Sequence, residues 1–362
     1  MTKEPQNSRI RVLVVDDSAF MRTALSKMIE LDPDLEVAGT AAGGREALQT
    51  IPRLDPDVIT LDVEMRGMDG LETLRRIMEQ CPRPVIMVSS VTERDAEITF
   101  NALAAGAFDY VPKELSPASL DVLHIRESLI SRIKAAAKSR KPKAQVDPGK
   151  KPPSAELSIQ SASRLPAAIV AIGVSTGGPK ALEEILPCFP KDLPAPILIV
   201  QHMPAGFIRP FAERLNKMSA IVVREASNGE AVHPGVVYLA PAGLHMTVER
   251  VTKLRTIICL SEWPQNQMHV PSVNVTMRSV AAMFHAEAMG VIMTGMGSDG
   301  VEGMTAIYRE GGKTVGQDEA SCAVYGMPKA CVEMGIVDKV VPLAQIPLEI
   351  LQATRRYQVT AG

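Results

Sequence analysis

The chain has 362 residues, 46% of them apolar, and this length and composition predict two domains with a connector between them. Its 39 lysines and arginines nearly balance its 41 aspartates and glutamates, so the net charge of -2 argues against binding to nucleic acid or to anionic membranes. The five cysteines have no CxxC spacing, which argues against a zinc site and a disulfide framework.

The beginning of the chain, MTKEPQNSRI, is polar, and no apolar run is long enough for a membrane span or a signal peptide. The odd number of scattered cysteines is typical of a reducing compartment. We therefore expect a soluble, cytoplasmic protein without direct insertion into a membrane.

Short β-branched runs alternate with helical stretches in the first third of the chain. Strands are expected over residues 12–15, 58–61 and 85–88, and helices over residues 19–30 and 70–80. This alternation is typical of βα units around a buried parallel sheet. It predicts an α/β domain over residues 1–128.

Acidic residues follow the expected strands of this domain. Asp16 and Asp17 come after the first strand and Asp62 after the third, so a parallel sheet brings all three to one edge. Carboxylates that crowd together need a cation, and hard oxygen ligands with open positions favour Mg²⁺. The same ion would assist transfer of a phosphoryl group to Asp62.

Two further side chains are expected at this edge. Ser89 ends the fourth strand and can hydrogen-bond a phosphoryl oxygen, and Lys113 follows a fifth short strand and can pair with its charge. Any one of the aspartates alone is more often a turn residue or a helix cap. Five matched positions in order favour a phosphorylation site.

A segment rich in lysine, arginine, proline and serine separates the two halves of the chain. Residues 129–164 include the run KSRKPKAQVDPGKKPPSAE, which has almost no large apolar residues to bury. We interpret this segment as a flexible basic linker. Such linkers are usually solvated and do not by themselves indicate nucleic-acid binding.

The second half contains a further set of apolar runs. Strands are expected over residues 168–172, 197–200, 236–239 and 290–293, with helical segments and Gly-Pro punctuation between them. The pattern predicts a second α/β domain over residues 165–358, with a doubly wound and mostly parallel sheet.

Three residues at the ends of these strands carry the groups of a serine hydrolase. Ser175 lies in GVSTGGP directly after the first strand, where glycines allow a sharp turn into a helix. His202 follows the second strand and Asp299 the fourth, so both share an edge with Ser175. In a triad the histidine accepts the serine proton and the aspartate orients the imidazole. The alternative is a phosphate-binding loop, although the Lys-Ser/Thr ending of a P-loop is absent.

The glycines around Met296 leave backbone amides available to a developing oxyanion. Other histidines compete with His202 for the role of the base. His233 and His245 do not directly follow a strong strand, so we interpret them as structural or cleft-lining residues, and His269 precedes VPSVN.

The runs VLVVDDSAFMR, DVITLDVEMRGMDG, PVIMVSS and AAGAFDYVPK carry a resemblance to a known family. Residues 10–125 resemble the receiver domain of bacterial two-component response regulators. The resemblance implies a (βα)5 fold, phosphorylation of Asp62 by a sensor histidine kinase, and Mg²⁺ held by Asp16, Asp17 and Asp62. It also implies that Ser89, Tyr110 and Lys113 respond to phosphorylation. Glu114 stands where the family usually has a proline.

The runs GVSTGGP, QHMPAGFIRPFAERLN, SNGEAVHPGVVYLAPAGLHM, MTGMGSDG and VYGMP carry a second resemblance. Residues 166–350 resemble the catalytic domain of the chemotaxis protein-glutamate methylesterases. This implies phosphorylation-activated hydrolysis of glutamyl methyl esters on methyl-accepting chemoreceptors, with release of methanol and no cofactor for the esterase reaction. In some members of that family, receptor glutamines are also deamidated.

The second resemblance implies that Ser175, His202 and Asp299 form the triad, that Thr176 lies beside the nucleophile and that the Met296 amide faces the oxyanion. Val270 stands where the family usually has an arginine, and Asn274 where it often has an aspartate. These two departures bear on substrate selectivity more than on the chemistry.

Two other classes of function agree less well with the sequence. A transcription regulator is disfavoured because no basic recognition helix follows the linker. A scaffold without activity is disfavoured because the serine, histidine and aspartate are all present. An enzyme with the same chemistry that serves a sensory array unrelated to motility stays open, as does the extent of deamidation.

Overall fold

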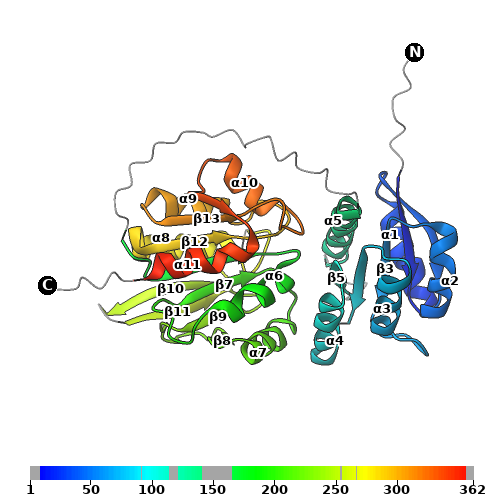
Figure 1. Cartoon of the computed structure of the whole chain (residues 1–362), viewed down its shortest axis with the longest axis horizontal. Helices are drawn as coiled ribbons and strands as arrows, with labels where there is room; N and C mark the ends of the chain where they lie inside the picture. The colour runs from blue at the N-terminus through cyan, green and yellow to red at the C-terminus, as the bar shows by residue number, and fades with distance from the viewer. Residues whose placement is uncertain are drawn as a thin grey trace, which may run out of the picture. The chain divides into compact units, whose positions relative to one another are not determined.

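The computed structural model describes residues 9–90, 92–113, 121–140, 165–252, 255–265 and 267–355. The chain divides into two compact units, residues Met1–Glu156 and Leu157–Gly362 (Figure 1). Each unit is built around its own parallel sheet. The predicted two-domain α/β class is therefore confirmed.

The sheet of the first unit has the strand order β2-β1-β3-β4-β5, and its described strands pair in parallel throughout. The order reverses between β1 and β3, and at such a reversal loops diverge and leave a crevice at the carboxyl edge. The strands are β1 (Ile10–Val15), β2 (Leu35–Ala41), β3 (Val58–Asp62), β4 (Val85–Ser89) and β5 (Asp109–Pro112).

Helices cover both faces of this sheet. The first to fourth helices are α1 (Ala19–Glu30), α2 (Gly44–Leu54), α3 (Gly70–Gln80) and α4 (Glu93–Ala104), and the fifth is α5 (Asp121–Arg140). Side chains cap three of them, because Ser18, Asp69 and Thr92 each accept a hydrogen bond from an amide of the first turn. Helices α1 and α5 share one apolar cluster with β1.

Helix α5 corrects the predicted start of the linker at residue 129. The helix continues to Arg140, and Leu129, Ile133 and Ala136 are buried against the sheet. Apolar residues at this helical spacing form one face, which stabilises the helix by packing although the same segment is rich in basic residues. The rest of the predicted linker, residues 141–164, lies outside the described residues, as does Glu114.

The second unit contains a seven-stranded sheet with the order β14-β13-β12-β6-β7-β9-β8, in which neighbouring described strands are parallel. An antiparallel hairpin, β10 (His245–Thr252) and β11 (Arg255–Ser261), stands beside it. The sheet consists of β6 (Ile169–Val174), β7 (Ile197–Gln201), β8 (Val222–Glu225), β9 (Val236–Leu239), β12 (Ala288–Ile292), β13 (Lys313–Gln317) and β14 (Lys339–Val341).

The strand order of this sheet reverses between β6 and β12, so right-handed connections place helices on both faces. Helix α8 packs its buried Met277 and Val280 against β6 in the main apolar cluster of the unit. The helices are α6 (Gly178–Ile185), α7 (Ile208–Met218), α8 (Val273–Phe284), α9 (Val301–Arg309), α10 (Met327–Glu333) and α11 (Ile346–Thr354). The β6/β12 reversal is where a ligand crevice is expected.

Candidate functional site

Ser175 follows β6 at the reversal of the strand order. The chain turns sharply into α6, because the Gly178 amide donates to the Ser175 carbonyl over 2.8 Å and Gly177 has a φ of 77°. A Cβ at Gly178 would lie 2.0 Å from Gln201 Oε1, so a larger residue cannot make this turn. The turn leaves Ser175 at the carboxyl edge of the sheet with 9% of its surface exposed.

His202 lies at the same edge, one strand away. The register pairs Val174 with Gln201, and the His202 amide donates to the Val174 carbonyl over 3.2 Å. Ser175 and His202 are therefore the next residues of two adjacent strands, whose axes are about 4.8 Å apart. The predicted nucleophile and its base begin from neighbouring backbone positions.

Asp299 reaches His202 from the loop after β12. Its Oδ2 lies 2.9 Å from His202 Nε2, and about nine-tenths of both side chains is buried. His202 Nδ1 is buried and has no hydrogen-bond partner among the described residues. Because Nε2 is engaged by Asp299, Nδ1 is the nitrogen left to accept a proton.

The Asp299 carboxylate also sits on the N-terminus of α8. Its Oδ2 accepts a hydrogen bond from the Val273 amide at 2.8 Å, and its Oδ1 accepts from Ser272 Oγ at 2.9 Å and from the Asn274 amide at 3.1 Å. Burial by itself raises the pKa of Asp299, but the His202 contact and the two amides lower it more, to about 2. The carboxylate is therefore ionised at neutral pH.

This pKa gives an expected pH dependence of stability. The folded value of about 2 lies below the usual 3.8, so ionised Asp299 should stabilise the fold above about pH 4 and lose this effect as pH falls through 2. The size should be about 2 kcal/mol. We expect the difference in unfolding free energy between wild type and Asp299→Asn to shrink by that amount from pH 5 to pH 2.

Urea unfolding of the second unit can be followed through Trp263, the single tryptophan of the chain. Both proteins share every other carboxyl group, so their general acid destabilisation cancels in the difference. A difference that stays constant over this pH range would contradict the low pKa.

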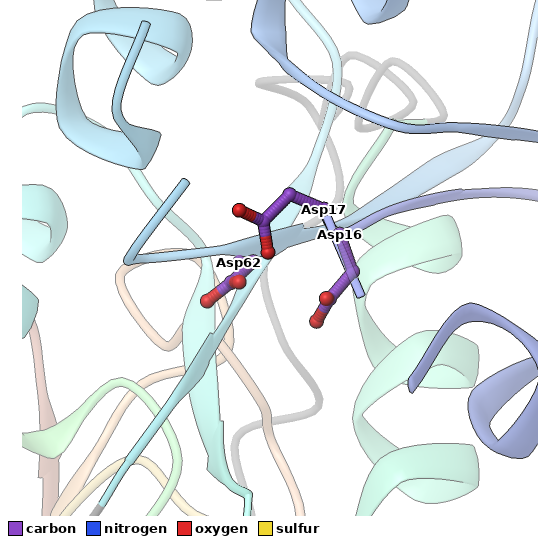
Figure 2. Close-up of side chains that lie close together, drawn as sticks. All are labelled: Asp16, Asp17 and Asp62. Carbon is purple, nitrogen blue, oxygen red and sulfur yellow. The ribbon is translucent and has the colours of Figure 1, made fainter. Parts of the chain in front are cut away.

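The first unit holds three carboxylates at the reversal between β1 and β3. Asp16, Asp17 and Asp62 offer oxygen atoms that all lie within 4.8 Å of one another (Figure 2). Lys113 Nζ lies 2.6 Å from Asp62 Oδ1 and 3.3 Å from Asp16 Oδ2. Burial is the main cause that raises the pKa of Asp62 to about 6, and Asp16 adds to it, whereas Lys113 opposes it.

The carboxylates have the donor chemistry that a divalent cation needs. Asp16 and Asp62 are almost fully buried, whereas the Asp17 side chain is 30% exposed, so water can complete the coordination. Asp16 Oδ2 is buried and accepts no hydrogen bond among the described residues, and its nearest positive charge is the Lys113 ammonium at 3.3 Å. These residues fit Mg²⁺, which Asp16, Asp17 and Asp62 would hold.

The residues predicted to respond to phosphorylation lie on β4 and on or directly after β5, the two strands on one side of β3. Ser89 is fully buried and accepts a hydrogen bond from Thr99 Oγ1 of α4 at 2.9 Å. The Lys113 amide donates to the Ser89 carbonyl over 2.8 Å, and Tyr110 is 4% exposed. Ser89 and Lys113 are thus linked through the backbone, and the response of all three residues stays a prediction.

Two domain families match the chain. Residues 170–350 match the family model of the CheB methylesterase domain, and residues 12–123 match that of the response regulator receiver domain. A protein-glutamate methylesterase/protein-glutamine glutaminase 2 of Nitratidesulfovibrio vulgaris is 46% identical over 364 residues, which cover 94% of this chain and 98% of that protein. The chain belongs to the CheB methylesterase family.

Further relatives agree with this assignment. A protein-glutamate methylesterase/protein-glutamine glutaminase of Halalkalibacterium halodurans is 46% identical over 350 residues, 96% of this chain and 99% of that protein. The crystal structure of the Thermotoga maritima CheB methylesterase catalytic domain is 38% identical with a TM-score of 0.50, and covers 52% of this chain and 99% of that chain. The predicted family is therefore confirmed. Among the described residues, no helix is long and apolar enough to cross a membrane.

Thr176 directly follows Ser175 in the chain, and Met296 lies in the loop after β12, which contacts Ser175. The Ser175 amide donates to the Thr294 carbonyl over 3.0 Å, and Thr294 Oγ1 donates to the Thr176 carbonyl over 2.9 Å. A Cβ at Gly295 would lie 2.9 Å from the Ser175 Cβ. Met296 therefore directly follows two residues, Thr294 and Gly295, that contact Ser175. Its role at the oxyanion stays a prediction.

The other histidines of the methylesterase unit differ in position. His269 stacks on His202 with ring centroids 4.1 Å apart, a contact that the sequence did not predict. His245 is buried, and its Nδ1 accepts from the Ser272 amide while its Nε2 contacts the Pro264 carbonyl. Burial lowers the pKa of His245. His233 is exposed.

The sequence did not predict that Ser272 binds Asp299, and it indicated Asn274 only as a position that affects substrate selectivity. A serine directly before an apolar helical run is a signal for an N-cap. That signal would have placed Ser272 at the start of α8, but the Ser272 hydroxyl donates to Asp299 and does not cap its own helix. The aspartate replaces the serine as the acceptor for the first turn of the helix.

Proposed function

We propose that the chain hydrolyses glutamyl methyl esters on methyl-accepting chemoreceptors, releases methanol, and is activated by phosphorylation. The observation that carries this proposal is the buried Asp299 and His202 pair beside Ser175, at the reversal of a parallel sheet. The relatives carry the activity in their names. Methanol release from a methylated receptor, measured with and without a phosphodonor, tests it.

In this reaction Ser175 Oγ attacks the ester carbonyl while His202 Nδ1 accepts the serine proton. Asp299 stabilises the imidazolium that forms, and the Met296 amide donates to the oxyanion. The ester C–O bond then breaks, and His202 returns the proton to the departing methoxide, which leaves as methanol. Water, activated by the same imidazole, hydrolyses the acyl-serine to glutamate and free serine.

Deamidation of receptor glutamines uses the same groups. The related proteins are also named protein-glutamine glutaminases, and an amide differs from the ester in its leaving group, which departs as ammonia after His202 protonates it. Both activities should therefore depend on Ser175. Ammonia release from receptor that carries glutamine at the modified positions tests this part of the proposal.

The receiver unit would accept a phosphoryl group on Asp62 from a sensor histidine kinase. Mg²⁺, when bound, would neutralise negative charge at the transferring group. Lys113 holds a positive charge 2.6 Å from Asp62 Oδ1, and Ser89 lies at the end of the adjacent strand. The cytoplasmic location and the identity of the kinase and receptor are predictions that rest on the family.

We infer that the unphosphorylated receiver unit restrains the methylesterase unit. Both units belong to one chain, so the receiver acts at high effective concentration, and phosphorylation shifts the population toward an active arrangement. A fragment that begins at Leu165 should then exceed the unphosphorylated full-length protein in methanol release on the order of tenfold. The two proteins are compared on the same methylated receptor at equal folded concentration.

Full-length protein treated with acetyl phosphate serves as the control and should approach the rate of the fragment. A fragment that is no faster than the unphosphorylated chain would rule out restraint. That result would indicate that the phosphorylated receiver makes a positive contribution.

A further inference from the structure

The N-termini of α8 and α9 hold each other through crossed hydrogen bonds. Asp299, just before α9, accepts from the amides of Val273 and Asn274 in the first turn of α8. In return Asn274 Oδ1, on α8, accepts from the amides of Gly300 and Gly303 at 2.9 and 3.0 Å. Each helix therefore supplies the acceptor that the other helix needs at its start.

We propose that Asn274 is a positioning residue that fixes Asp299 for its contact with His202, and that its neutral amide keeps a second negative charge away from this pair. The proposal deepens the proposed function, on which its effect on turnover rests. Asn274 touches the Asp299 segment twice, because its own amide binds Oδ1 and its side chain binds the amide of Gly300, the next residue. A shift of Gly300 would move Asp299.

Gly300 cannot supply a hydrogen-bond acceptor for the amides in the first turn of α9. It is the N-cap of α9 with a φ of 108° and has no side chain to accept a hydrogen bond, so the Asn274 side chain takes the place of a capping residue. The two helices are also closely packed, since a Cβ at Gly303 would lie 2.5 Å from the Met277 Cβ. If the Asn274 side chain were removed, there would be little room for another side chain to take its place as the acceptor.

The charged groups around the N-termini of α8 and α9 determine what an aspartate at position 274 would do to the Asp299 and His202 pair. Asp299 is ionised, His202 is bonded to it, His269 stacks on His202, and His245 reaches Ser272 behind the carboxylate. On the exposed side Arg278 of α8 pairs with Glu302 of α9. A carboxylate at 274 would add negative charge beside Asp299 and favour the protonated imidazole, which cannot act as the base.

The test compares Asn274→Ala, Asn274→Asp and the control Arg278→Gln in the full-length protein. The alanine variant should lower kcat for methanol release by about tenfold or more with KM within about twofold, because it displaces Asp299. The aspartate variant keeps both acceptor bonds, so its kcat should recover at high pH, while the acid limb of its pH profile moves up by about one unit. Arg278→Gln breaks an exposed ion pair between the same helices and should change neither quantity.

A second readout does not need turnover. In histidine-labelled full-length protein, the NMR titration of His202, assigned with His202→Asn, should move to higher pH in Asn274→Asp. If no variant or wild type releases methanol but this shift occurs, the proposed function fails and the charge effect of position 274 on His202 stands. A folded Asn274→Ala protein with wild-type kcat overturns the inference, as does an Asn274→Asp protein whose His202 titration equals that of the wild type.

Discussion

Replacing Ser175 with alanine should lower methanol release from methylated receptor by roughly 10³- to 10⁶-fold while the protein stays folded. The reason is that Ser175 supplies the oxygen that forms the covalent acyl intermediate, and alanine leaves His202 and Asp299 with no nucleophile to activate. The change removes one oxygen atom from a turn whose hydrogen bonds are made by the backbone, so the fold should not depend on it. Single-turnover methanol release and circular dichroism measure the two effects.

The matched control is Ser219→Ala, because the Ser219 hydroxyl is buried without a hydrogen-bond partner among the described residues and should be dispensable. His202→Ala and Asp299→Ala should also cripple hydrolysis, and the Ser175→Ala and His202→Ala double variant should be no slower than Ser175→Ala alone. Additive losses would show that the residues do not act as one unit. Near-normal turnover by folded Ser175→Ala would remove the serine from the mechanism.

Asp62→Asn should abolish phosphorylation and with it all stimulation of the methylesterase, while basal methanol release persists. Asparagine has almost the same shape but lacks the nucleophilic oxygen, and the carboxylate and Lys113 pair of the resting state is lost with it. Labelled phosphate incorporation from the donor acetyl phosphate should be undetectable in this variant. In wild type, excess EDTA should prevent incorporation, because the Asp16, Asp17 and Asp62 cluster needs a cation before it can meet an anionic donor.

Asp69→Asn is the control for this experiment. Asp69 caps α3 near the carboxylate cluster, and asparagine caps a helix about as well as aspartate, so phosphorylation should be retained. Incorporation that continues in Asp62→Asn would place the phosphoryl group on another residue. Incorporation in wild type that is indifferent to EDTA would exclude the metal-dependent scheme.

The sequence by itself predicted the two α/β units and the edge at which each site lies. Apolar runs of strand length located β1, β3, β6, β7 and β12, and a parallel sheet forces the residues after such strands to one edge. This is why Asp16 and Asp62, and likewise Ser175 and His202, could be grouped before any contact was known. The start of the linker was misjudged because the basic composition of residues 129–140 hid the apolar face of α5.

Tertiary structure alone decided which atoms meet within each site. The stacking of His269 on His202, the exchange of hydrogen bonds between Asp299 and Asn274, and the Thr99 contact to Ser89 join residues from different elements of the fold. No periodic pattern encodes these contacts, because they depend on how α8 packs against α9 and how α4 lies on its sheet. Strand ends are set by local chemistry, whereas the partners of each side chain are set by helix packing.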